Sequence, residues 1–495
     1  MICFNIFFAS PSCLYPYCLI FFFRSSPVAK LFLLATIKFA TRDAYGMGIE
    51  YEADKPGWND AMNGLPGMIG SGMPETFELL VLMRYLLSTV SKYKRPVIVP
   101  TELINLIDGI TLALDKLETS GYSDSPNLSV DVPVELFKYW DDVASAREEY
   151  RTATKFSFSG DEHTLPSSEA ISLLNQWIIQ LELGISRSLS IGHHGHGDNG
   201  TSGLTPTYFS FIVSKWEKTG KTNKDGHFLV VPKQMEVGRF PLFLEGPVHM
   251  MKTVGTTGAL SIYSKVKNSS LHDDGLNMYT ISGSLEGQSY DMGRMMAFSP
   301  GWLENQSVWL HMSYKYYLQL IRNGLHKQFF DEMVSGGMLP FMNPDIYGRS
   351  LMQCSSFIAS SAFMDPSVRG RGFLPRLSGA TAEFLSMWVL MFIGPQPFFV
   401  DDNSNELHMQ LQPTLPTWLF KNDGIDLQVS FELFSAINVT YHNEKQRDIV
   451  GISPERYVVG LRDGSVMKVD GPTIPSDLAI KIRRVVFVEY IDAYF

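Results

Sequence analysis

The chain of 495 residues is poor in cysteine and has no excess of basic charge. Three of its four cysteines, Cys3, Cys13 and Cys18, lie in the first 18 residues, so Cys354 stands alone in the remainder. This pattern excludes a disulfide framework or thiolate metal site from the bulk of the chain and favours a reducing compartment. Lys and Arg number 41 against 51 Asp and Glu, a net charge of −10. Because phosphate backbones are bound by clustered basic residues, no nucleic-acid partner is expected.

The first 36 residues lack the charge pattern of a targeting segment. Residues 1–23 contain no charged side chain, whereas a signal peptide places basic residues ahead of its apolar stretch. Pro11 and Pro16 interrupt the apolar run, which argues against a membrane anchor. We therefore expect residues 1–36 to be an apolar leader outside the folded domains, such as a non-native start, and a cytoplasmic protein without a stable membrane partner. The alternative is a membrane-anchored or secreted protein in which this leader is genuine.

Composition and patterning predict a globular protein with two kinds of domain. Hydrophobic residues make up 45% and charged residues 19%, and the length favours two or three domains. Apolar residues at helical spacing predict helices at 74–91, 99–118, 133–152, 167–188, 305–323 and 378–394. After Pro395 the pattern changes to short β-branched or aromatic runs separated by turn residues. We predict a mainly helical region at 37–395 and a β-rich domain at 396–495.

The stretch 51–80 combines an aromatic face, an amide and a carboxylate on consecutive residues. Gly57-Trp58-Asn59-Asp60 precedes a Gly-rich run, and a helix is predicted from Pro74. Aromatic faces pack on sugar C–H surfaces, so a loop that carries Trp58 and Asp60 is typical of a sugar-binding site with a general acid. Positive φ angles are expected in this non-helical loop at four glycines, namely Gly64, Gly67, Gly70 and Gly72.

Three further clusters are candidates for chemistry. Glu304 and His311 are seven residues apart, two turns along one helix face, so both can point into one cleft. Ser378-Gly379 opens a predicted helix, where free N–H groups can face an anion. Residues 193–198 contain three histidines, a potential metal site, but a His run interleaved with Gly is more often a solvated loop, so no metal is predicted.

Each of these patterns also has a purely structural explanation. Trp58 alone is more typical of packing, Glu304 with His311 of an ordinary helix-face pair, and Ser378 of an N-cap. Their joint occurrence, in order, on one chain is what favours the functional interpretation.

These motifs resemble those of the cellobiose phosphorylase family of inverting glycoside phosphorylases, in particular its divergent large branch. The similarity covers about residues 37–445 and rests on KPGWNDA with NGLPG, PGWLEN and RLSGATAEF. It implies a mainly α fold, an incomplete (α/α)6 barrel or six-hairpin toroid, followed by a β-sandwich or jelly-roll-like domain. The family's N-terminal sandwich, linker and first barrel helices lie upstream of the W-N-D motif, where this chain has only 57 residues, so an N-terminally truncated fragment is expected.

The resemblance also implies roles for individual residues. Asp60 corresponds to the general acid, which has to hold a proton at neutral pH, and this predicts that Asp60 is partly buried against Trp58. Because phosphate is already an anionic nucleophile, the second carboxylate of an inverting hydrolase is replaced by an anion site. The remaining implied roles are saccharide contacts at Trp58, Asn59 and Glu304 and phosphate contacts at His311, Ser378 and Gly379.

The implied reaction is reversible inverting phosphorolysis of a β-linked glucan or gluco-disaccharide to α-glucose 1-phosphate by a hexosyltransferase. Inorganic phosphate is the co-substrate and no metal or organic cofactor is expected. The linkage, the chain length and the activity of the fragment stay open, and a homodimer is compatible with the family. The family's upstream phosphate-contacting Arg and its sugar-binding Arg and Asp have no counterpart, and Leu303 and Glu383 depart from the usual residues. The alternatives are an inverting hydrolase with Glu304 or Glu383 as base, or a non-catalytic carbohydrate-binding remnant.

Overall fold

The computed structural model describes residues 4–5, 24–53, 57, 59–124, 128–192, 203–375, 378–422 and 427–495. The fold combines helices with several small sheets and ends in a strand-rich C-terminal region. Two compact units are present: Met1–Tyr316 with Met342–Pro375, and Tyr317–Phe341 with Arg376–Phe495. The predicted domain boundary at residue 395 stays a prediction. Within the described ranges, every helix is too short or too polar to cross a bilayer.

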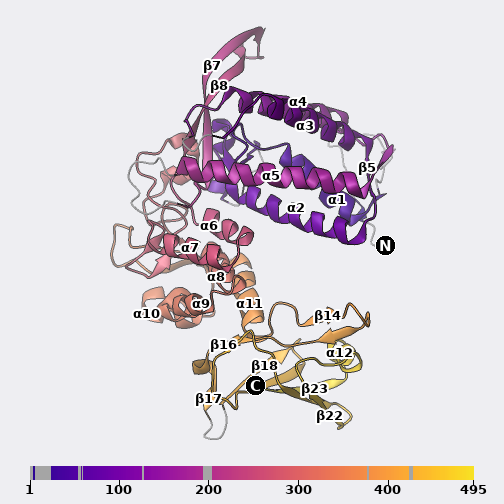
Figure 1. Cartoon of the computed structure of the whole chain (residues 1–495). Helices are drawn as coiled ribbons and strands as arrows, with labels where there is room; N and C mark the ends of the chain where they lie inside the picture. The colour runs from indigo at the N-terminus through magenta and orange to yellow at the C-terminus, as the bar shows by residue number, and fades with distance from the viewer. Residues whose placement is uncertain are drawn as a thin grey trace, which may run out of the picture. The chain divides into compact units, whose positions relative to one another are not determined.

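The first unit is built on long helices that pack in pairs. Helix α2 packs on α5, and α3 packs on α4 (Figure 1). Gly109 of α3 makes the second pair close, because a Cβ there would lie 2.8 Å from the Cβ of Ala146. These four helices confirm the predictions from hydrophobic spacing. Helix α1 precedes them and contacts α2, and its Phe32 and Ala35 are fully buried, so the expectation that residues 1–36 lie outside the folded domains was wrong for residues 27–36. Their bounds are α1 Pro27–Phe39, α2 Met73–Tyr93, α3 Thr101–Thr119, α4 Val134–Ala153 and α5 Ser167–Gly192.

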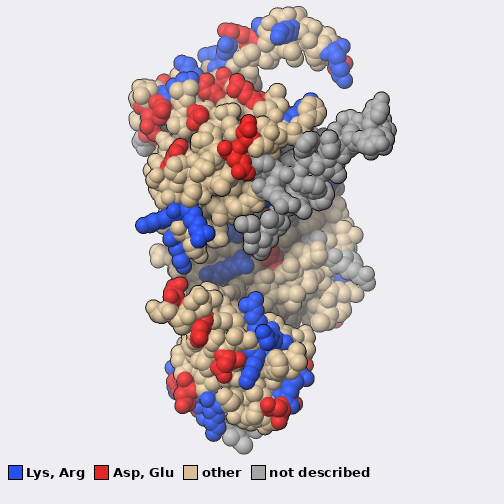
Figure 2. Space-filling model, turned by 90° about the vertical axis from the view of Figure 1, so that its right-hand side faces the viewer, with Lys and Arg blue, Asp and Glu red and all other residues tan. Residues whose placement is uncertain are grey.

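A four-stranded sheet in the order β3-β4-β7-β8 holds the loop that carries Asp60. Glu50 of β3 pairs with Ser71 of β4, and the N–H of Tyr51 donates to Gly70 O at 2.8 Å. Both ends of the loop 51–70 are therefore fixed to the same sheet. β7 and β8 continue as a long hairpin, along which lysines are visible in Figure 2. The strands are β3 Ile49–Glu50, β4 Ser71–Gly72, β7 Tyr208–Thr222 and β8 Phe228–Arg239.

The rest of the first unit consists of shorter elements. Trp302 packs against the rings of Phe357 and Phe373 on a three-stranded sheet, β11-β12-β13. The helices are α6 Glu245–Met250, α7 Thr256–Lys267 and α10 Pro344–Tyr347. The strands are β1 Phe4–Asn5, β2 Arg24–Ser25, β5 Val97–Pro100, β6 Glu162–Leu165, β9 His272–Asp273, β10 Met278–Tyr279, β11 Val308–Trp309, β12 Ser355–Ile358 and β13 Gly372–Pro375.

The second unit contains a six-stranded sheet in the order β17-β18-β19-β23-β21-β22, in which β19 and β23 are parallel. This sheet confirms the prediction of a β-rich C-terminal region. Its strands are β17 Lys421–Asn422, β18 Leu427–Leu433, β19 Ile437–His442, β21 Arg456–Leu461, β22 Val466–Asp470 and β23 Val488–Tyr494. Short strands are β14 Phe398–Val400, β15 Leu407–Met409, β16 Thr414–Leu415 and β20 Ile449–Val450. Its helices are α9 His326–Glu332, α11 Ser378–Phe392 and α12 Ser476–Arg483.

Helix α8 (Leu310–Arg322) begins in the first unit and continues into the second. The helix predicted at 305–323 begins only at Leu310. Trp302 and Asn305 form an isolated β-bridge, and strand β11 lies between this bridge and the helix. The predicted helix 378–394 is confirmed as α11, which ends at Phe392.

The glycines after Asp60 have a different function from the predicted one. None of the four has a positive φ, and the left-handed position in the loop is taken by Ile69 at φ 49°. The loop also contains two 3₁₀ turns, Asp60–Met62 and Leu65–Met68, so its description as non-helical was wrong in part. Gly64 is needed for close approach, since a Cβ there would lie 1.7 Å from the carbonyl oxygen of Asp291.

We predict that Gly64→Ala lowers the free energy of unfolding by at least about 2 kcal/mol, because the methyl group collides with backbone that cannot move aside. Gly67→Ala is the matched control: nothing lies within 4 Å of a Cβ at Gly67, so a change within about 0.5 kcal/mol is expected. Denaturant unfolding of both variants measures the difference. Equal stabilities would show that the Gly64 contact with Asp291 does not constrain the loop.

Candidate functional site

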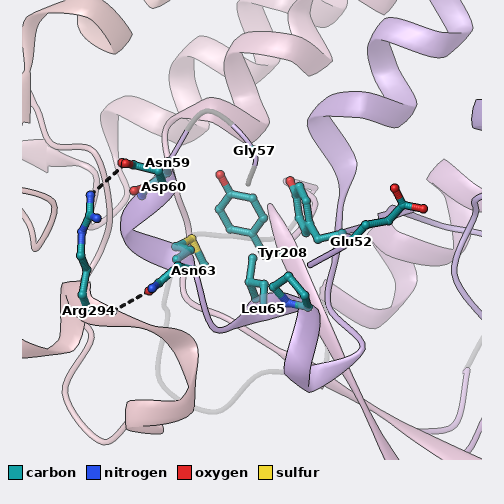
Figure 3. Close-up of a pocket in the computed structure, with 11 residues that line it drawn as sticks. Glu52, Gly57, Asn59, Asp60, Asn63, Leu65, Tyr208 and Arg294 are labelled. Atoms are coloured by element: carbon teal, nitrogen blue, oxygen red, sulfur yellow. Dashed lines mark hydrogen bonds and ion pairs between the residues drawn. The ribbon is translucent and has the colours of Figure 1, made fainter. Parts of the chain in front are cut away.

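A pocket of about 320 Å³ opens beside the loop that carries Asp60. Its walls include Asn59, Asp60 and Arg294 on one side and Tyr208 on another (Figure 3). Tyr51 also lines the pocket, and its ring centroid is 6.2 Å from that of Tyr208. Tyr208 is the first residue of β7, and its pairing with Gly72 joins β4 to the hairpin. Amide, carboxylate, guanidinium and aromatic groups thus line one cavity in the first unit.

Asn59 and Asp60 come from the 3₁₀ turn at the pocket edge. Asn59 Oδ1 accepts a hydrogen bond from the N–H of Ala61 at 3.2 Å, which caps the turn. Asn59 is buried, yet its Nδ2 makes no hydrogen bond to any described residue. The Asp60 side chain is 59% exposed, so the expected partial burial of Asp60 was wrong. Trp58, the predicted saccharide contact and burial partner, lies outside the described residues.

Arg294 is a pocket residue that the sequence analysis missed. Its guanidinium forms an ion pair with Asp60 Oδ2 at 2.9 Å, and its backbone N–H donates to Asn63 Oδ1 at 3.0 Å (Figure 3). The side chain is 52% exposed and so can turn away from Asp60 without breaking a packed core. A signal was present in the sequence, since Arg294 is the only Lys or Arg between Lys267 and Lys315.

Glu304 is close enough to Asp60 and Arg294 to interact with both electrostatically. Burial raises the pKa of the Glu304 carboxyl, Arg294 lowers it, and the Asp60 charge raises it. Glu304 Oε2 is buried and makes no hydrogen bond to any described residue. The structure therefore brings Asp60, Glu304 and the unpredicted Arg294 into one electrostatic cluster, with a carboxyl oxygen of Glu304 that still lacks a hydrogen-bond partner.

His311 lies in the first turn of α8, where it is half-buried. Burial and, to a smaller degree, the positive charge of Lys315 together lower the pKa of His311 to about 4. Lys315 is four residues later, on the same face of the helix. At neutral pH this face therefore offers a neutral imidazole beside a lysine, a pairing that the sequence analysis did not anticipate.

The remaining predicted site residues lie elsewhere. Ser378 and Gly379 form the start of α11 in the second unit, and their approach to His311 stays a prediction. The His-rich segment 193–198 lies outside the described residues. Among the residues that are described, no group of three or more His, Cys, Asp or Glu side chains is arranged to hold a metal ion.

Behind the two tyrosines lies a set of buried carboxyl groups that the sequence analysis also missed. The Tyr51 hydroxyl donates to the Glu75 carboxylate, whose two oxygens lie 3.0 and 3.1 Å from Tyr51 Oη. The Tyr208 hydroxyl donates to Glu245. Burial raises the pKa of Glu75 and raises that of Glu245 to about 7, where the neighbouring Glu75 charge adds to the effect. No local motif marks these residues, because they meet only where α2, α6 and β7 pack.

No model of a known protein family matches the chain, and no curated protein matches it.

We predict that His311 makes the protein less stable in acid. The unfolded chain binds a proton at His311 near pH 6.5 and the folded chain only near 4, so the free energy of unfolding falls as the pH drops from 6.5 to 4. His311→Gln should reduce this fall by up to about 2 kcal/mol, as the side chain is partly solvated. Denaturant unfolding between pH 4 and 7 measures it.

The control for this experiment is His227→Gln, because His227 is exposed in the turn of the hairpin. His227→Gln should leave the pH dependence unchanged. A His311→Gln profile that also matches the unsubstituted protein would contradict the buried, neutral imidazole.

Proposed function

We propose that the pocket binds a β-linked gluco-saccharide and that the site carries out reversible inverting phosphorolysis, with α-glucose 1-phosphate as product. The observation that carries this proposal is the ion pair of Asp60 with Arg294, which lies beside two tyrosine rings and beside the Asn59 amide nitrogen, unpartnered among the described residues. The pairwise packing of α2 on α5 and of α3 on α4 supports part of an (α/α)6 barrel, and the six-stranded sheet supports a C-terminal β-sandwich-like domain.

The part of the pocket formed by Asn59 and the two tyrosines suits a neutral polyol. The Asp60 and Arg294 charges neutralise each other, while Asn59 Nδ2 needs an acceptor. Sugar hydroxyls can accept from that amide, and the apolar ring faces of Tyr51 and Tyr208 match the C–H faces of a pyranose. A glucosyl unit in this pocket therefore satisfies both the polar and the aromatic walls.

Cleavage needs a proton for the leaving oxygen, which Asp60 supplies. The C–O bond to the leaving sugar breaks as Asp60 protonates that oxygen, and a phosphate oxygen bonds to the anomeric carbon from the opposite face. Incoming phosphate, a dianion, can bind the Arg294 guanidinium. Arg294 thereby takes the part of the phosphate-contacting arginine that the sequence lacks upstream.

The phosphate side includes a lysine in addition to the residues implied by resemblance. His311 is neutral at pH 7 and contributes an N–H donor, while Lys315 supplies the positive charge on the same helix face. The phosphate contacts that the resemblance implies at Ser378 and Gly379 belong to α11 in the second unit and stay predictions.

An inverting hydrolase is the second candidate, because Glu304 is near Asp60. A general base for water must be ionised, and burial shifts Glu304 toward its protonated form, which favours the phosphorylase. Glu383, the other candidate base, belongs to α11 in the second unit.

We predict that Asp60→Asn abolishes phosphorolysis. The chain is incubated with cellobiose or laminaribiose and phosphate, and glucose 1-phosphate is measured; the loss should be at least about 100-fold because the leaving oxygen is no longer protonated. Asp291→Asn is the matched control, an exposed carboxylate that is bonded to Ser289 Oγ and lies outside the pocket lining.

Three outcomes of this assay oppose the proposal. Unchanged turnover in Asp60→Asn removes the general-acid role. Glucose release without phosphate identifies a hydrolase. Saccharide binding without any turnover, in the unsubstituted chain, identifies a carbohydrate-binding remnant.

We predict that Arg294→Met raises the KM for phosphate at least about tenfold, since a charge-assisted contact worth roughly 1.5–3 kcal/mol is lost. The KM for the saccharide should change much less. Initial rates at varied phosphate measure the effect, and Arg84→Met is the control because Arg84 of α2 forms an exposed ion pair with Glu182 of α5. An increase confined to the saccharide KM would place Arg294 in the sugar site instead.

A further inference from the structure

Two tyrosines of the pocket wall are each anchored to a buried carboxyl group. Tyr208 donates to Glu245 Oε2, and Tyr51 donates to Glu75. The centroids of the two tyrosine rings are 6.2 Å apart, so both carboxyl groups belong to one cluster behind the pocket. Glu245 is 6% exposed and sits at the start of α6. A titrating carboxyl thus lies one hydrogen bond behind the pocket surface.

His249 lies between this cluster and the protein surface. Its Nδ1 is 2.5 Å from Glu78 Oε1, and its Nε2 is 3.8 Å from Glu245 Oε1. Burial lowers the pKa of His249, so the imidazole is neutral near pH 7. Although burial acts to raise it, hydrogen bonds from His249 and Lys252 hold the pKa of Glu78 at about 2.

These ionisation states fix the imidazole tautomer. Because ionised Glu78 can only accept, the single proton of neutral His249 is on Nδ1. Nε2 is then an unprotonated acceptor that faces Glu245, and it makes no hydrogen bond to any described residue. Such a buried unpaired acceptor is costly unless it is used intermittently. The Glu78 side chain is 44% exposed, so the row of side chains Glu245, His249 and Glu78 reaches solvent at Glu78.

We propose that Glu78, His249 and Glu245 form a proton relay between solvent and the Glu245 carboxyl group that holds Tyr208, and that Glu245 is a positioning residue for the saccharide. The proton of Glu245 passes from Oε1 to His249 Nε2, giving a carboxylate and an imidazolium. The imidazolium passes its Nδ1 proton to Glu78, which releases it to water at the exposed edge, and His249 is left neutral with its proton on Nε2. No bond other than these O–H and N–H bonds changes, and no co-reactant is consumed.

The relay acts on the pocket through Tyr208. With its hydroxyl hydrogen bound to Glu245, Tyr208 is left as a hydrogen-bond acceptor for a sugar hydroxyl, and an ionised Glu245 strengthens that hydrogen bond. The positioning role rests on the proposed saccharide pocket, whereas the relay itself does not. Charged and titratable groups that act on Glu245 come from every neighbouring element: Glu75, Tyr208, His249, Lys252 and Lys315.

The relay is tested by carbon-13 NMR of Glu carboxyl groups in the full chain from pH 5 to 9. One carboxyl should titrate near pH 7, disappear in Glu245→Gln and move its midpoint by at least about one unit in His249→Gln. Glu332→Gln is the matched control, because Glu332 is equally buried but belongs to α9 in the other unit. A midpoint that His249→Gln leaves in place would overturn the relay.

The positioning role is tested by calorimetric titration of cellobiose and laminaribiose at pH 6 and pH 8. The affinity of the unsubstituted chain should rise at least about threefold at pH 8, whereas Glu245→Gln should still bind, because its amide oxygen accepts from Tyr208, but without pH dependence. Glu245→Leu should lose binding. Equal pH dependence in Glu245→Gln would remove the positioning role. If neither disaccharide binds at all, the saccharide pocket and the positioning role fail together, and the NMR titration still decides the relay.

Discussion

The buried carboxylate of Asp43 is the interaction on which the site depends. It accepts hydrogen bonds from three backbone N–H groups of the turn 45–48, at 2.7 to 3.1 Å, and from Ser71 Oγ at 2.6 Å. Burial raises the pKa of Asp43 and these hydrogen bonds lower it, so desolvation is offset by four donors aimed at one side chain. Because Ser71 lies in β4 and the turn leads into β3, Asp43 fixes the pairing of the two strands. The loop 51–70 between them therefore has fixed ends, and Asp60 is placed by a group that never touches the pocket.

The pocket also depends on close backbone contact between the loop of Asp60 and the segment that carries Arg294. Gly64 packs against the carbonyl of Asp291, and its N–H donates to Met292 O at 3.1 Å, which sets the segment of Arg294 against the loop of Asp60. The residues that meet here are separated by more than 200 positions in the chain.

The pocket is built from residues that are far apart in the sequence, and this explains which features could be predicted from the sequence and which could not. Hydrophobic spacing is a local property, so the pattern that begins at Pro74 predicted α2 correctly, and the short β-branched runs after Pro395 predicted the C-terminal strands. The need for glycine at Gly64 was apparent, but its cause was not, because the atom that excludes a side chain belongs to Asp291. Tyr208 and Glu245 carry no motif at all, since their chemistry arises only when β7 and α6 pack together. The same holds for the exposure of Asp60, which depends on the surrounding fold.

The carboxyl groups around the pocket differ in environment in a way that suits the proposed chemistry. Asp60 is exposed and paired with a guanidinium, whereas Glu245 and Glu304 are buried and shifted toward the protonated form. In the proposed reaction Arg294 supplies a positive charge to which a phosphate dianion can bind, whereas water carries no charge and gains no such contact. The same guanidinium would therefore favour phosphate over water as the nucleophile.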